Sequence, residues 1–106
     1  MPRIKVKIER FTDDANPGWV ECSFVDAAGV VQLFDQKVPW VTAEDLDARS
    51  TYPRDGIIDC SIISTRRGAD GREVLSVYVD CGSRSGQTEF EVFREQVVEP
   101  NEGVPA

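Results

Sequence analysis

The chain has 106 residues, of which 41% are hydrophobic and 29% are charged, and this balance is typical of one soluble domain with a modest core. Nineteen Asp and Glu residues against twelve Lys and Arg residues give a formal net charge of −7, which opposes the long-range attraction of nucleic-acid phosphates. The absence of histidine excludes His-based triads, His general bases and His metal ligands.

The chain begins with the alternating pattern of a strand. Apolar and charged residues alternate from Ile4 to Phe11, so we expect one face of this strand to be buried and the other to be wet. The same charges leave no secretory core in MPRIKVKIER. No apolar run in the chain approaches the ~20 residues of a membrane span. We therefore expect a cytoplasmic protein with no membrane association.

A hairpin and a short helix follow. Strands are predicted over Trp19–Asp26 and Val30–Val38, joined by DAAG, in which Gly29 suits the positive φ of a short hairpin loop. The stretch Thr42–Ala48 begins with a capping-type residue and has acidic residues in its first turn, which predicts a short helix. Such a helix is too short to stand alone, so we expect Leu46 to pack on the sheet.

The second half of the chain predicts another hairpin, Gly56–Arg67 with Arg72–Cys81, and a last strand, Thr88–Phe93. Residues 1–98 then form one domain, and the polar stretch 99–106 is expected to be a frayed tail. Six short antiparallel strands, with a helix between the third and the fourth, predict a mainly β, six-stranded barrel of the OB-like or SH3-like kind. A helix-plus-sheet α+β fold fits the same pattern.

The three cysteines are predicted to be core residues. Cys22, Cys60 and Cys81 each lie in phase with apolar neighbours, and a small thiol packs as a modest hydrophobe. No CxxC pair is present and there is no histidine to partner a thiol, so we expect neither a metal site nor a cofactor.

Three arginines surround the turn of the second predicted hairpin, in STRRGADGRE. If Arg67 opposes Arg72, then Asp59 opposes Asp80, and Arg66 forms an ion pair with Glu73. Opposed like charges are unfavourable. A bulge could shift the register, twist and water could screen the charges, or the arginines could hold an anion and the aspartates a cation. We favour a solvated hairpin tip, with Arg66, Arg67 and Arg72 as candidate anion-binding residues.

The first predicted hairpin carries an apolar outer face. If Val25 opposes Val30, the core face holds Val20, Cys22 and Phe24, and a second apolar face points outward. Other parts of the chain could cover this second face, a second copy or a partner could bind it, or it could stack single-stranded nucleic acid as OB-folds do. The candidate interaction face consists of Trp19, Val25, Val30, Phe34 and Trp40.

The stretch WVECSFVDAAGVVQLFDQKVPW, with YPRDGIIDC and FEVF further on, resembles small uncharacterised bacterial β-rich proteins. The resemblance covers most of the chain. It rests on core and turn residues, so it implies a fold and no particular activity. It provides no catalytic residue to carry over.

No motif in the sequence supports catalysis. TRRGADG lacks the GK[ST] ending of a phosphate-binding loop, and DAAG is too short to cradle a phosphate. We therefore expect a non-enzymatic acidic protein-interaction module, either dimeric or an inhibitor or immunity-type protein for a basic partner. The alternative is an OB-like binder of single-stranded nucleic acid or oligosaccharide, which would use the aromatic face and the arginine-bearing tip.

Overall fold

The computed structural model describes residues 1–99, and the predicted tail lies outside this range except for Glu99. The described chain is mainly β and antiparallel, as expected, but it has eight strands and not six. The elements are β1 (Arg3–Asp13), β2 (Trp19–Val25), β3 (Val31–Lys37), the helix α1 (Val38–Val41), β4 (Arg54–Asp59), β5 (Ser61–Arg67), β6 (Glu73–Tyr78), β7 (Glu89–Phe93), the 3-10 turn η1 (Arg94–Gln96) and β8 (Val97–Val98).

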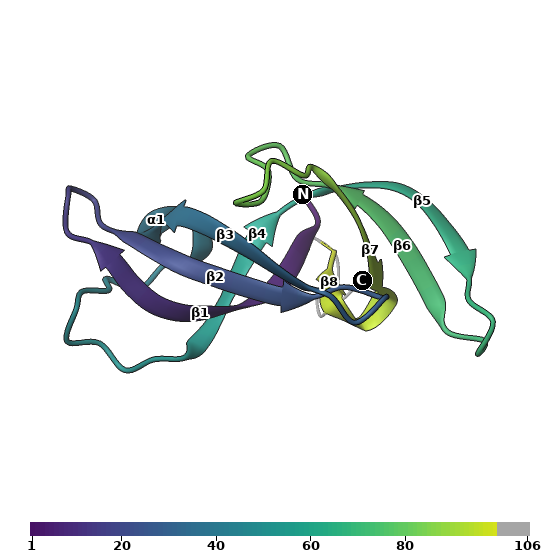
Figure 1. Cartoon of the computed structure of the whole chain (residues 1–106), viewed down its shortest axis with the longest axis horizontal. Coiled ribbons are helices and arrows are strands. Elements are labelled where there is room, and N and C mark those ends of the chain that lie inside the picture. Colours follow the sequence, from purple (N-terminus) through teal and green to yellow (C-terminus); the bar gives the residue numbers. More distant parts are fainter. Residues whose placement is uncertain (100–106) are drawn as a thin grey trace, which may run out of the picture.

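The strands form two sheets (Figure 1). The first has the order β3-β2-β1-β4, with β8 also paired to β1, and the second has the order β5-β6-β7. Single backbone hydrogen bonds connect the sheets, from the Ala27 N–H to the Glu91 carbonyl and from the Arg84 N–H to the Leu33 carbonyl, each 2.8 Å. No strand ladder joins them within residues 1–99, so the predicted closed barrel is wrong for this part of the chain.

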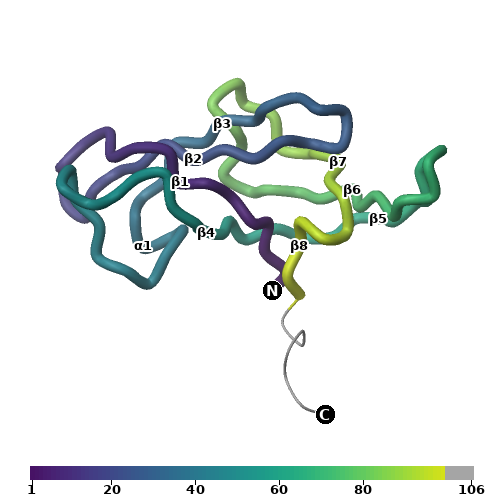
Figure 2. The backbone as a smooth tube through the Cα atoms, turned by 90° about the horizontal axis from the view of Figure 1, so that it is seen from below, coloured from purple at the N-terminus to yellow at the C-terminus, as the bar shows by residue number. Residues whose placement is uncertain are grey.

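The barrel prediction failed because the single strand expected over Gly56–Arg67 is two strands in different sheets. The break falls at Cys60, whose N–H donates to the Pro2 carbonyl at 3.0 Å and whose side chain is buried. The chain therefore leaves the first sheet after β4 and enters the second at β5. In Figure 2 the β5–β6 hairpin extends away from the rest of the molecule.

The first hairpin has a register one residue away from the predicted one. Val25 pairs with Val31 and not with Val30, and Cys22 pairs with Phe34. The reason is the loop, in which the Asp26 carboxylate accepts hydrogen bonds from the N–H groups of Ala28 and Val30, both at 2.9 Å. Val30 therefore belongs to the loop, and every side chain of β3 changes face relative to the prediction.

The core lies between the two sheets. Ile4, Val6 and Ile8 of β1 are buried, as their alternation predicted. Phe34 is also completely buried, because the observed register turns it inward. Its ring lies 5.5 Å, centroid to centroid, from those of Phe24 in the same sheet and Phe90 in the second sheet.

The helix is displaced from its predicted position at Thr42–Ala48. The helical turn is Val38–Val41, with a proline in its first turn, and it buries Val38 and Val41. After it, the Thr42 hydroxyl accepts a hydrogen bond from the Glu44 N–H at 3.1 Å, and local bonds of this kind compete with helix formation. Leu46 is nevertheless buried, as expected.

Candidate binding site

A cavity with a volume of about 550 Å³ lies where the first sheet meets the turn after β6. We call it the Trp40 cavity. Three segments that are distant in the sequence supply most of its walls: α1, the end of β4 and the turn after β6. Its main lining residues are Pro39, Trp40, Ile57, Asp59, Asp80 and Cys81.

Trp40 forms the exposed side of this cavity, and 55% of its surface is accessible. The short helix determines this orientation, because its apolar neighbours Val38 and Val41 turn inward and leave Trp40 outward. The Lys37 Nζ lies 5.0 Å from the centre of the Trp40 ring and 5.7 Å from that of Trp19. The indole of Trp40 is therefore accessible and already contacts one cation.

The charged groups of the cavity carry a net negative charge. Arg3 Nε lies 3.5 Å from Asp59 Oδ1, so these two charges offset each other. Asp80 accepts a hydrogen bond from the Tyr78 hydroxyl at 3.2 Å, which raises the pKa of Tyr78. Within residues 1–99, Asp80 takes part in no ion pair. One carboxylate of the cavity is thus without a cationic partner in the described chain.

Cys81 differs from the expectation that all three thiols are core residues, because it is exposed and lines the cavity. The buried amide of Gln36 donates a hydrogen bond from Nε2 to its Sγ at 3.0 Å. Cys22 and Cys60 are buried as predicted, and burial raises their thiol pKa values to about 12 and about 11. Among the described residues, no group of three or more Cys, Asp or Glu side chains could hold a metal ion.

The predicted interaction face is divided in the structure. Trp19 and Trp40 both have their rings near the Lys37 ammonium. Phe34 is in the core and contributes nothing to the surface, because the register differs from the predicted one. Val25 and Val30 are exposed at the loop end of the first hairpin, together with Val31. Of the predicted face, Trp40 is the residue that lines the Trp40 cavity.

The hairpin tip has a different register from the one that placed Arg67 opposite Arg72. Arg67 pairs with Glu73, and an irregularity between Ile62 and Ser64 restores the expected pairing further along β5. The bulge considered from the sequence is therefore confirmed. It removes the like-charge pairing of the arginines, and Asp59 instead pairs with Arg3 of β1.

Each of the three tip arginines has a partner within the chain. The predicted ion pair between Arg66 and Glu73 is absent from the described residues. Arg66 instead donates two hydrogen bonds to the Glu91 carboxylate, at 3.0 and 3.1 Å. Arg67 donates to the Gly71 carbonyl at 2.7 Å. Arg72 binds Glu95 and lies 3.4 Å from the centre of the Phe93 ring. Anion binding at this tip stays a prediction.

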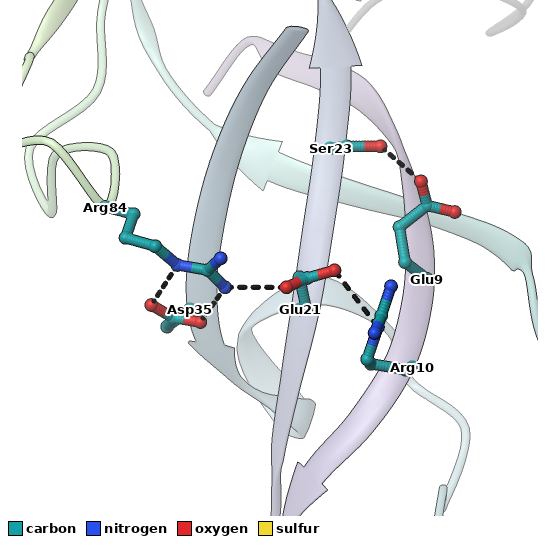
Figure 3. A network of polar contacts seen from close by, with 6 residues as sticks. All are labelled: Glu9, Arg10, Glu21, Ser23, Asp35 and Arg84. Atoms are coloured by element: carbon teal, nitrogen blue, oxygen red, sulfur yellow. Dashed lines mark hydrogen bonds and ion pairs between the residues drawn. The ribbon is translucent and has the colours of Figure 1, made fainter.

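A charge network holds the turn after β6 against the first sheet (Figure 3). The Arg84 guanidinium makes a fork with the Asp35 carboxylate at 3.0 and 2.6 Å, and it donates to Glu21 Oε2 at 2.8 Å. Glu21 also forms an ion pair with Arg10, whose Nε lies 3.1 Å from Glu21 Oε1. These hydrogen bonds lower the pKa of Asp35 and raise that of Arg84. The network positions the turn that brings Asp80 and Cys81 to the cavity.

Sequence reasoning identified Trp40 but missed Asp80, Cys81 and Arg84 as parts of one region. Arg84 and Asp35 are 49 positions apart, and no local pattern relates them. Within the described chain no helix is long and apolar enough to cross a membrane. Comparisons with protein-family models, with curated proteins and with solved structures returned no match.

Proposed function

We propose that the protein is a non-enzymatic, acidic interaction module that binds an extended segment of a basic partner protein at the Trp40 cavity. The observation that carries this proposal is the exposed indole of Trp40 at the edge of a cavity of about 550 Å³. Tryptophan is enriched among the residues that dominate the energy of protein interfaces, particularly where it borders a pocket.

The dimensions and lining of the cavity support this function. A volume of about 550 Å³ lies within the range of roughly 300–1,000 Å³ that is typical of ligand pockets. Pro39, Ile57 and Trp40 provide apolar surface, while Asp59 and Asp80 provide polar groups. An apolar wall with a few charged groups is suited to one side chain of a peptide and its immediate neighbours.

The overall charge supports a basic partner. A net charge of −7 accelerates the association of a cationic protein and repels a phosphate backbone. An inhibitor or immunity-type role is one specific form of this proposal. The alternative, an OB-like binder of nucleic acid or oligosaccharide, would require the tip arginines to exchange the carboxylates and the carbonyl that they contact for a ligand.

The test begins with selection of peptides from a displayed random library on the immobilised protein. The selected peptides are then synthesised and titrated into isotope-labelled protein. We expect chemical-shift changes at the Trp40 indole N–H and at Cys81. We also expect binding to be lost in Trp40→Ala and retained in Val31→Ala, a matched surface truncation outside the cavity. Equal binding by both variants, or shifts confined to other surfaces, would overturn the proposal.

Two further measurements separate the alternatives. Titration of oligo-dT at low salt should leave the tryptophan fluorescence unchanged, whereas quenching that salt reverses would support the nucleic-acid reading. Light scattering on the same sample gives the mass. If the protein is a dimer and Trp40→Ala makes it a monomer, the cavity binds a second copy of this chain and not a different basic protein.

A further inference from the structure

We propose that the Trp40 cavity recognises an arginine side chain of the partner, with its guanidinium stacked on Trp40 and paired with Asp80. This inference rests on the proposed function and specifies the chemistry of the anchor. It follows from the charge balance of the cavity, from the accessibility of the Trp40 indole and from the planar shape of a guanidinium, which can contact Trp40 and Asp80 together.

The charge balance selects a cation. Of the three charged residues that line the cavity, Arg3 and Asp59 offset each other across 3.5 Å, which leaves the charge of Asp80. Among the described residues, the hydroxyl of Tyr78 is the one hydrogen-bond donor to Asp80, and a carboxylate has about four lone-pair sites. Asp80 can therefore accept further hydrogen bonds from a ligand. The negative charge of Asp80 would repel an anionic anchor.

The indole selects a group that can stack. Lys37, which does not line the cavity, already holds its ammonium 5.0 Å from the Trp40 ring centre, so the π-system lies in a position that attracts cations. A planar guanidinium can stack on an aromatic face and at the same time present a fork of N–H donors to a carboxylate. An ammonium is a compact point charge and offers no such planar surface. The combination of Trp40 and Asp80 thus favours arginine over lysine.

The molecule itself contains one arginine that combines a ring contact with a carboxylate, Arg72, and a second arginine, Arg84, that forms the carboxylate fork alone. Arg72 places its guanidinium 3.4 Å from the Phe93 ring while it binds Glu95. Arg84 binds Asp35 as a fork. In the Trp40 cavity the aromatic ring and the carboxylate are present, and the described chain supplies no arginine to Asp80.

The experiment compares acetyl-arginine amide with acetyl-citrulline amide, which has nearly the same shape and no charge. Each is titrated into labelled protein, and the shifts of the Trp40 indole N–H and of Cys81 are followed. We expect the arginine compound to bind about two- to fivefold more tightly than the citrulline compound, as for a partly exposed charge pair. This difference should shrink at high salt.

Two variants assign the contacts. Asp80→Asn should weaken binding of the arginine compound to the level of citrulline and leave citrulline itself unaffected. Asp14→Asn, which neutralises an exposed carboxylate outside the cavity, should change neither. Trp40→Leu should weaken both compounds, because both stack on the ring. An unchanged preference for arginine in Asp80→Asn would overturn the inference.

Failure of this inference is distinguishable from failure of the proposed function. If library-selected peptides bind at the Trp40 cavity but arginine and citrulline compounds bind equally, the cavity is an interface with a neutral anchor. If neither the peptides nor the compounds shift Trp40, both proposals are wrong. Nα-acetyl-lysine amide, titrated in the same way, is the third compound, and a stronger response to it than to the arginine compound would refute the stacked guanidinium.

Discussion

The position of Phe34 allows a direct test of the fold, because the sequence pattern placed it on the surface and the structure places it in the core. Truncation to alanine removes a completely buried ring that contacts Phe24 in its own sheet and Phe90 in the other. Replacing a buried phenylalanine by alanine costs about 3–5 kcal/mol. Single domains have a total stability of only about 5–15 kcal/mol, so Phe34→Ala should be close to unfolding.

The assay is urea denaturation followed by circular dichroism, with thermal unfolding of the same samples. For a domain of this size the loss corresponds to a fall in Tm of roughly 12 °C or more. Val31→Ala is the control, since Val31 is 58% exposed and should change the free energy of unfolding by no more than about 0.5 kcal/mol. If Phe34→Ala does not fold, Phe34→Leu should still lose about 1–2 kcal/mol.

A loss below about 1 kcal/mol for Phe34→Ala, with the fold intact, would refute the observed register. It would mean that Phe34 lies at the surface and that Val30 pairs with Val25. The three-ring contact between the sheets would then be absent. The β3 side chains that are buried, and with them the location of Trp40, would then differ from those described above.

Three further predictions concern the charge network, a turn and the thiols. Arg84→Ala should lower the free energy of unfolding at neutral pH. The difference from the wild type should shrink as the pH falls below about 4, because the lowered pKa of Asp35 contributes stability only while its carboxyl is ionised. Urea midpoints of the two proteins should therefore converge at low pH, and a constant difference between them would contradict the prediction. Gly18→Ala should lower the free energy of unfolding by about 1–3 kcal/mol, since φ is +97° and the added Cβ would lie 2.9 Å from a ring atom of Phe11. Gly29→Ala, at φ +85°, places its Cβ where no atom lies within 4 Å, so it should lower the free energy less in the same urea assay. A thiol reagent should modify one cysteine rapidly in the native protein, Cys81, and all three in denaturant; rapid native reaction of a second thiol would show that the core is open.

The sequence predicted the parts of the fold that local pattern determines. Alternation identified the buried face of β1, and the core positions of Cys22 and Cys60 followed from the same reasoning. It failed at the first hairpin, because loop length decides register and the hydrogen bonds of Asp26 extend the loop to Val30. A change of one residue was enough to move Phe34 from surface to core.

Other features depend on contacts between distant segments and have no local signal. Nothing in the residues around Cys60 marks the end of a strand, and the Cys60 N–H donates its hydrogen bond to a distant residue, at the Pro2 carbonyl. The Trp40 cavity also depends on contacts between segments that are distant in the sequence. Trp40 could be identified as an exposed aromatic candidate, but Asp80 reaches the same place only because the following turn is held to the first sheet by Arg84.

The pairing of β8 with β1 has a consequence for how the chain assembles. Arg3 pairs with Val98 and Ile4 with Val97, so the two strands that meet are at opposite ends of the described sequence. During synthesis, β1 can pair with β2 and β4 as soon as these emerge, whereas this contact must wait until Val97 and Val98 have been made. Among the strand pairings of residues 1–99, it also closes the longest loop, with only two residue pairs. We therefore expect this seam to form last, and its amide protons to be among the first to exchange with solvent.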